Sequence, residues 1–253
     1  MSTACKPVVK ATTPVLGCGV ALRLEAVSFD VADAAAVAAF WAGMLDREVV
    51  AESDGVLVPG DQRQVGLRFV TSDTEQVGPR RLHLHLTSSS LEHQQRTVET
   101  ALRLGGYHID VGQSPDDDFV VLADPDGNEL CVIEPGNNYL AGTGYLGEVT
   151  CDGSRNVGMF WSDALGWPLV WDENQQTAVQ SPLGGTKISW DSWGGPMVEP
   201  KNGRNRQRFD LVTTAPTGEA KRLVSLGATR LADLHDGIEL ADPDGNEFSL
   251  HAH

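Results

Sequence analysis

The sequence has no apolar run of the roughly 20 residues that a membrane-crossing helix needs. Its start also lacks the uninterrupted apolar core of a secretory signal, because Lys6, Pro7, Lys10 and Pro14 fall within it. Residues 1–19 mix small, polar and proline residues without any period, so we expect a flexible segment there. We therefore predict a cytoplasmic protein that has no membrane partner.

Basic residues are scarce: 19 Lys and Arg stand against 35 Asp and Glu, which gives a net charge of -16. Such a chain repels a phosphate backbone unless its basic residues gather in one patch, and the sequence shows no such patch. Cysteine is scarce too, with four residues that have no close paired spacing. This usage favours a reduced, cytosolic protein over a disulfide-stapled one. We exclude nucleic acid as a partner.

Common catalytic motifs are missing as well. No glycine-rich phosphate loop follows a strand and opens a helix, and there is no Gly-x-Ser-x-Gly elbow. Neither a phosphate-loop nucleotide site nor a hydrolase-type serine nucleophile is expected.

A short repeat is the most informative feature that is present. Asp-Pro-Asp-Gly-Asn-Glu occurs at 124–129 and again at 242–247, each time between two apolar runs. Proline fixes φ at the second turn position, and Asp, Gly and Asn tolerate left-handed backbone, so each copy predicts a hairpin turn with a structural role. The spacing does not fit a calcium-binding loop, because the glycine stands at the fourth position.

Other landmarks repeat at nearly the same distance. Phe40-Trp41 returns as Phe160-Trp161, 120 residues later, while the two turns are 118 residues apart. A repeat of this length indicates two homologous domains, which we place at residues 20–135 and 144–253 with a linker at 136–143. Within each domain a strand, a helix and several strands occur twice, so the chain is predicted to hold four βαβββ units.

The first half shows the expected elements most clearly. Alternation predicts strands at 22–31, 65–71 and 81–87, with shorter ones at 47–51 and 55–58, and helical spacing predicts helices at 34–45 and 91–104. Trp41 falls on the apolar side of the first helix and is expected in the core. In 81–87, His83 and His85 face the side opposite to the leucines.

These landmarks together resemble a known family. Val27-Ser28-Phe29-Asp30, Phe40-Trp41, residues 81–86 and the stretch from Asp124 to Cys131 are similar to the glyoxalase/bleomycin-resistance group of the vicinal oxygen chelate superfamily, over residues 22–251. The resemblance implies an α+β fold of two tandem glyoxalase-like domains, whose four modules form curved, cup-shaped mixed sheets with helices outside. The two units of each half are expected to share one cup. The fold hosts metal-dependent isomerases, lyases, dioxygenases and thiol transferases, and also metal-free binding proteins.

The resemblance also implies where a divalent metal would be held, by His, Gln or Glu on the first and last strands of each unit. The matching positions here are Ala26, Arg68, His83 and Cys131 in the first domain, and Leu146 or Glu148, Ser189, Arg208 and Ser249 in the second. These residues are a poor set for a hard ion, so we predict no cofactor. An off-pattern divalent metal stays open, because alternation could bring together His83, His85 and Glu129 in one cup, and Glu148, Asp210, Glu247 and His251 in the other.

Eight residues are the candidate ligand-binding set: Arg68, His83, His85, Cys131, Glu148, Trp190, Arg208 and Ser249. Trp190 and Trp193 are expected at a cup edge, where a ring can stack on a planar ligand. Cys131 could also serve as a nucleophile beside His83 or Arg68, against the alternative of an inert strand cysteine.

The sequence therefore predicts a metal-independent protein that binds a small hydrophobic or aromatic molecule, as in the sequestration of an antibiotic or metabolite. An enzyme of the lyase, isomerase or dioxygenase type, with an off-pattern metal or with acid/base chemistry by His83, Glu148 or Glu247, is the first alternative. A degenerate module that binds another protein is the second. Because fusion can replace pairing of single domains, a monomer is expected, with a homodimer as the alternative.

Overall fold

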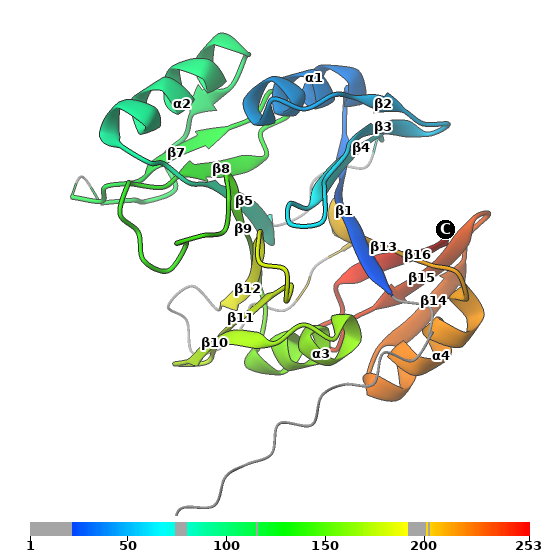
Figure 1. Cartoon of the computed structure of the whole chain (residues 1–253). Coiled ribbons are helices and arrows are strands. Elements are labelled where there is room, and N and C mark those ends of the chain that lie inside the picture. Colours follow the sequence, from blue (N-terminus) through cyan, green and yellow to red (C-terminus); the bar gives the residue numbers. More distant parts are fainter. Residues whose placement is uncertain (1–21, 74–79, 115, 192–200, 202) are drawn as a thin grey trace, which may run out of the picture.

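The computed structural model describes residues 22–253 except 74–79, 115, 192–200 and 202, and the predicted flexible segment 1–19 lies outside the described residues. The chain forms four modules, each of one strand, one helix and three further strands (Figure 1). The first two modules consist of β1 (Arg23–Val31), α1 (Ala34–Leu45), β2 (Val50–Ala51), β3 (Gly55–Val58) and β4 (Gly66–Thr71), then β5 (Leu82–Leu86), α2 (Leu91–Arg103), β6 (Tyr107–His108), β7 (Val120–Ala123) and β8 (Glu129–Val132).

The second half repeats this order. Its modules consist of β9 (Leu146–Asp152), α3 (Arg155–Leu165), β10 (Leu169–Glu173), β11 (Gln176–Gln180) and β12 (Lys187–Asp191), then β13 (Gln207–Thr213), α4 (Pro216–Leu226), β14 (Thr229–Asp233), β15 (Gly237–Ala241) and β16 (Glu247–Ala252). The four predicted βαβββ units are therefore confirmed. No helix in the described part of the chain is long and apolar enough to cross a membrane.

The modules pair across the two halves of the sequence. One eight-stranded sheet has the order β14-β15-β16-β13-β1-β4-β3-β2 and joins modules 1 and 4, while the other has the order β10-β11-β12-β9-β5-β8-β7-β6 and joins modules 2 and 3. The central joints are the antiparallel pairs β1–β13 and β5–β9. The expectation that the two units of each half share a cup is thus wrong, because each sheet takes one module from each half.

Both sheets bury one face against helices and leave the other face to line a cup. On β1, Val27, Phe29 and Val31 are buried in the same cluster as Phe40 and Trp41 of α1. That cluster of buried side chains extends through all four modules, so the molecule has a shared core. We call the helix-free faces the β1–β13 cup and the β5–β9 cup.

The repeated Asp-Pro turns have the structural role that the sequence predicts. Asp124 accepts a hydrogen bond from the indole nitrogen of Trp41 at 3.0 Å, and Asp242 accepts the matching bond from Trp161 at 3.3 Å. Both carboxyls are buried, and burial raises the pKa of Asp242 to about 6. Each turn therefore ties the second hairpin of its half to the first helix of the same half.

Candidate functional site

Four of the predicted site residues meet in the β5–β9 cup. His83 and His85 alternate on β5 with leucines that are buried on the helix side. The strand register places His85 opposite Cys131 of β8 and opposite Glu148 of β9. Side chains from both halves of the sequence therefore converge at His85.

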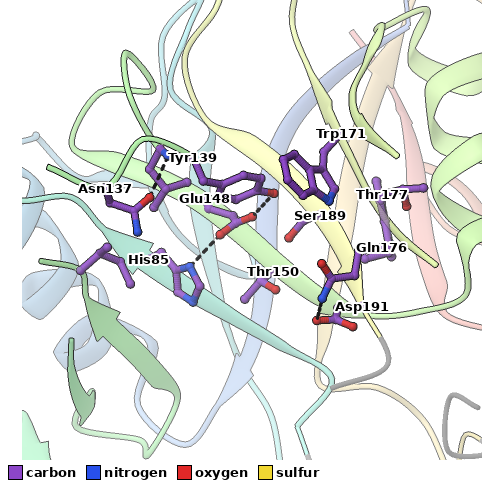
Figure 2. A pocket seen from close by; sticks show the side chains of 13 residues that line it. His85, Asn137, Tyr139, Glu148, Thr150, Trp171, Gln176, Thr177, Ser189 and Asp191 are labelled. Atoms are coloured by element: carbon purple, nitrogen blue, oxygen red, sulfur yellow. Dashed lines mark hydrogen bonds and ion pairs between the residues drawn. The ribbon is translucent and has the colours of Figure 1, made fainter. Parts of the chain in front are cut away.

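Glu148 is the centre of a buried hydrogen-bond network. Its Oε2 lies 2.7 Å from His85 Nδ1, and its Oε1 accepts a hydrogen bond of 2.8 Å from the Tyr139 hydroxyl (Figure 2). Burial alone would raise the pKa of Glu148, but hydrogen bonding to His85 and its charge lower it. Burial also opposes charge on His85, yet its hydrogen bonds with Cys131 and Glu148 raise its pKa to about 10. At neutral pH the pair is an imidazolium and a carboxylate.

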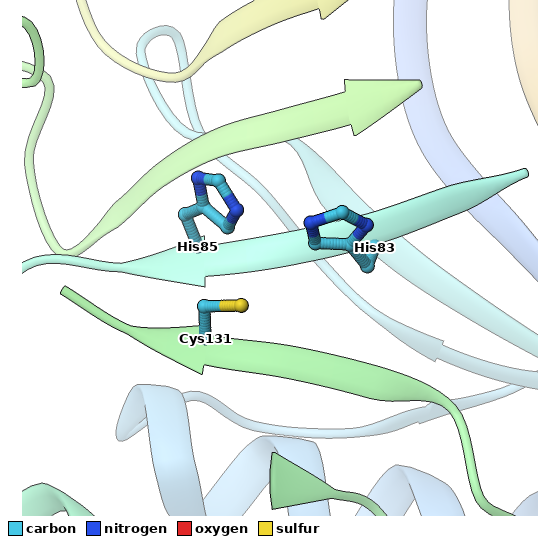
Figure 3. Close-up of side chains that lie close together, drawn as sticks. All are labelled: His83, His85 and Cys131. Carbon is cyan, nitrogen blue, oxygen red and sulfur yellow. The ribbon is translucent and has the colours of Figure 1, made fainter. Parts of the chain in front are cut away.

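His83 lies beside this pair in a different protonation state. Its ring centroid is 5.0 Å from that of His85, and its Nδ1 is 4.0 Å from Glu129 Oε1. Burial lowers the pKa of His83, and the neighbouring charge of His85 lowers it further, to about 3. A neutral imidazole thus stands next to an imidazolium, and both lie near Cys131, because the three donor atoms fall within 4.8 Å of one another (Figure 3).

A cavity of about 350 Å³ opens over this network, a volume in the range of small-molecule sites. The ion pair of His85 and Glu148 lies at one end, and Gln176 and Asp191 lie at the other, where the Gln176 amide donates to the Asp191 carboxylate at 2.6 Å (Figure 2). The remaining lining residues are mostly polar or aromatic: Ile133, Asn137, Tyr139, Leu140, Thr150, Trp171, Thr177, Ser189 and Trp190.

Comparison with known proteins identifies the fold that carries this cup. The model of the glyoxalase-like domain matches the chain twice, at residues 26–133 and 148–251. The chain belongs to the glyoxalase-like domain family. No curated protein sequence matches it.

Solved structures share the glyoxalase-like fold at low sequence identity. Glyoxalase I from Zea mays is 13% identical, with a TM-score of 0.65 over 92% of this chain and 93% of that one. A predicted dioxygenase from Bacillus subtilis is also 13% identical, with a TM-score of 0.55 over 90% of this chain and 84% of that one. At such identities the likeness establishes the fold alone.

The donor atoms of the β5–β9 cup fit a borderline metal ion. Two imidazoles and one thiol suit an ion such as Zn²⁺ in tetrahedral geometry, with one position left open, better than they suit Mg²⁺ or Ca²⁺. Glu148 holds His85 through Nδ1, as carboxylates commonly do for metal-binding histidines. His83, His85 and Cys131 are therefore the residues that would hold an ion, and the absence of a metal stays a prediction.

The other predicted site residues lie in the β1–β13 cup. Arg68 is bonded to three carboxylates, with distances of 2.7 Å to Glu52, 2.6 Å to Asp210 and 2.8 Å to Glu25. These partners raise the pKa of Arg68 although burial opposes its charge. The arginine is thus engaged within the protein.

Arg208 and Ser249 share this second cup. Arg208 forms a bidentate pair with Asp30 at 2.7 and 2.8 Å, and Ser249 is buried on β16, in register with Asp210. Glu247 and His251 of the proposed off-pattern set also lie on β16, paired with Lys201 and Asp236. The predicted grouping of Glu148 with Asp210, Glu247 and His251 is therefore wrong, because Glu148 belongs to the other sheet.

Trp190 does not lie at a cup edge as expected. It is 1% exposed, and its ring stacks on that of Trp161 with centroids 6.4 Å apart. Alternation along β12 turns Ser189 and Asp191 to the cup, so Trp190 points to the helix side and borders the cavity from within the core. Trp193 lies outside the described residues.

Sequence reasoning missed three parts of the site. Residues 136–143, predicted as a linker, bring Tyr139 into the cup. Trp171 on β10 and the Gln176–Asp191 pair on β11 and β12 complete the far end of the cavity. The alternation of Lys187, Ser189 and Asp191 is a signal that could have indicated Asp191.

Proposed function

We propose that the protein binds a small organic molecule in the cavity of the β5–β9 cup. The observation that carries this proposal is the contrast between the two cups. In the β1–β13 cup, Arg68 and Arg208 are bonded to carboxylates of the same chain. The β5–β9 cup instead combines a cavity of about 350 Å³ with polar groups of fixed orientation. A few oriented polar groups beside aromatic side chains are typical of ligand sites.

The hydrogen bonds of the Glu148 carboxylate are satisfied by the protein itself, without a bound metal ion. Both carboxylate oxygens have a protein partner, one in His85 and one in Tyr139. A preorganised network of this kind can orient a ligand without itself rearranging, which lowers the cost of binding. Metal-independent binding of an organic molecule is therefore the primary function proposed, in the manner of a sequestering protein.

A thermal-shift screen of small aromatic natural products tests this proposal. A compound that binds only the folded state raises Tm with its concentration. Trp171→Ala, which removes an exposed wall of the cavity, is expected to abolish the shift, whereas Tyr107→Ala, an exposed aromatic on the same sheet outside the lining, is expected to keep it. Shifts that survive Trp171→Ala but disappear in Arg68→Ala would contradict the proposal.

The cluster of His83, His85 and Cys131 favours a second candidate, a metal-dependent enzyme of the same fold. An ion held there would act as a Lewis acid on an oxygen of the bound molecule. The chain itself would supply Tyr139 and Glu148 at the cavity wall to orient that molecule.

Elemental analysis of protein purified without chelator or affinity metal separates the two candidates. About one tightly held transition-metal ion per chain, lost in Cys131→Ser, would support the enzyme. Protein free of metal that also fails to take up added Zn²⁺, Ni²⁺, Mn²⁺ or Fe²⁺ would support metal-independent binding.

A further inference from the structure

The chemistry of the cavity lining narrows the class of ligand. Resting on the proposed function of the β5–β9 cup, we propose that its cavity takes an aromatic amine, a molecule that carries an ammonium group next to a flat apolar ring system. The ammonium is received at the Gln176–Asp191 end, and the ring lies against Trp171.

Charge gives the first part of the argument. Among the described residues, the lining holds the acidic side chains of Glu148 and Asp191 and contains no Lys or Arg. His85 and Glu148 pair with each other at 2.7 Å at one end of the cavity, and Asp191 is the carboxylate at the other end. An anionic ligand would meet this carboxylate, while an ammonium would form a charge-assisted hydrogen bond with it.

The position of Asp191 is fixed by its surroundings. It ends β12 in register with Asp152 of the neighbouring strand β9, and the Gln176 side chain donates to its Oδ2 at 2.6 Å. A carboxylate that is already oriented loses little freedom when it receives a donor, so the interaction is favourable for binding. The net charge of -16 adds a long-range attraction for cations.

Aromatic side chains form the apolar part of the cavity. Trp171 is 38% exposed on β10, and its ring meets that of Tyr139 edge to face, with centroids 5.6 Å apart (Figure 2). An exposed tryptophan at a cavity wall offers a large flat contact area. Such a ring also attracts a nearby cation through its face.

Lys187 provides a local example of that attraction. Its Nζ lies 4.2 Å from the centroid of the Tyr139 ring and donates a hydrogen bond to the Tyr139 carbonyl oxygen. The protein thus already holds one ammonium on this aromatic residue. Lys187 is four residues before Asp191 on β12, and the carboxylate that its charge acts on is Glu148.

Three indoles that share a two-carbon side chain and differ in its terminal group test the inference by isothermal titration calorimetry: tryptamine as the cation, tryptophol as the neutral molecule and indole-3-propionate as the anion. We expect tryptamine to bind at least about tenfold more tightly than the other two, as a charge-assisted hydrogen bond predicts. Asp191→Asn should remove most of this preference, and Glu173→Gln, an exposed carboxylate on β10 outside the lining, should leave it unchanged. Trp171→Ala should weaken all three.

The outcomes separate this inference from the proposed function. Equal or tighter binding of tryptophol or indole-3-propionate, lost in Trp171→Ala, would overturn the amine class while the cavity remains the binding site. Tryptamine binding that is insensitive to both Asp191→Asn and Trp171→Ala would overturn both the amine class and the cavity as the binding site.

If none of the three compounds binds at millimolar concentration, the amine class is overturned, and the thermal-shift screen still decides the proposed function. Circular dichroism of each variant confirms that it is folded.

Discussion

Glu148 joins the two halves of the chain within the β5–β9 cup. Glu148 comes from β9 in the second half. Its partner His85 lies on β5 in the first half, and its partner Tyr139 lies in the segment that connects the two halves. The Glu148 side chain is 4% exposed, so the ion pair with His85 is largely removed from water. Such a pair depends on both members, because either one alone is a buried charge without a partner.

Replacing Glu148 with Gln should destabilise the protein by about 3–5 kcal/mol at neutral pH, the usual cost of removing one partner of a buried pair. The raised pKa of His85 means that its stabilising contribution is complete below the ordinary histidine pKa of about 6.5. That contribution is lost as pH rises through about 10. Urea denaturation at several pH values should therefore show a difference between wild type and Glu148→Gln that shrinks toward pH 10.

Tyr139→Phe is the control for this experiment, because it removes a hydrogen bond from an uncharged donor to the same carboxylate. It should cost about 1.5–3 kcal/mol, with little change from pH 6 to 9, as expected for a hydrogen bond to a charged group. A wild-type advantage over Glu148→Gln that stays constant from pH 6 to 10 would contradict the ion pair.

Asp242 should give a pH dependence of the same sign in a lower pH range. Burial raises its pKa to about 6, above the value of about 3.9 expected in the unfolded chain. The folded state therefore holds the proton more tightly, so the stabilising contribution of Asp242 is full below pH 3.9 and is lost as pH rises through 6. Asp242→Asn should flatten the decline of unfolding free energy between pH 4 and 6, measured by urea denaturation. A slope in Asp242→Asn that equals that of the wild type would exclude this role.

At the scale of single elements, alternation predicted much of the site from the sequence. Because side chains on a strand alternate, His83 and His85 were correctly assigned to the face opposite the leucines of β5. The same rule applied to β12 would have placed Trp190 with Ile188 on the helix side. Tyr139 could not be found in this way, because its position depends on the path of an irregular segment without any period.

Two helical glycines that look equivalent in the sequence have different surroundings in the structure. A Cβ at Gly158 on α3 would lie 1.9 Å from Thr177 Oγ1 on β11, whereas a Cβ at Gly218 on α4 would meet nothing within 4 Å. Gly158→Ala should therefore lose about 1–3 kcal/mol of stability through overpacking. Gly218→Ala should gain about 0.5–1 kcal/mol, because alanine favours the helix. Equal effects in urea denaturation would show that α3 does not approach β11 so closely.

For the whole molecule, the sequence predicted the number and order of modules but not their pairing. The repeats mark four similar units, and the apolar pattern of β1 suits either β5 or β13 as its neighbour. Local periodicity cannot choose between these partners, because both present the same alternation. The register of β1 with β13 and of β5 with β9 is a long-range property, and it decides which candidate residues share a cup.

This pairing predicts how the two halves behave when separated. The first half alone would leave β1 and β5 without their partner strands, and the second half alone would leave β13 and β9 without theirs. We expect residues 1–143 and 144–253, expressed separately, to give no folded monomer, and expect the two to form a 1:1 complex when expressed together. Size-exclusion chromatography with light scattering measures this. Two folded monomers with native-like circular dichroism would contradict the cross-half sheets. The full chain is predicted to be a monomer by the same measurement.

The most direct test of the β5–β9 cup as the binding site is two-dimensional ¹H–¹⁵N NMR with the compound that raises Tm most in the screen. The indole N–H of Trp171 reports on the β5–β9 cavity, and the Nε–H of Arg68 reports on the β1–β13 cup. Binding in the β5–β9 cup predicts that the Trp171 signal shifts in proportion to saturation while the Arg68 signal stays in place. A shift of Arg68 without any change at Trp171 would contradict the account.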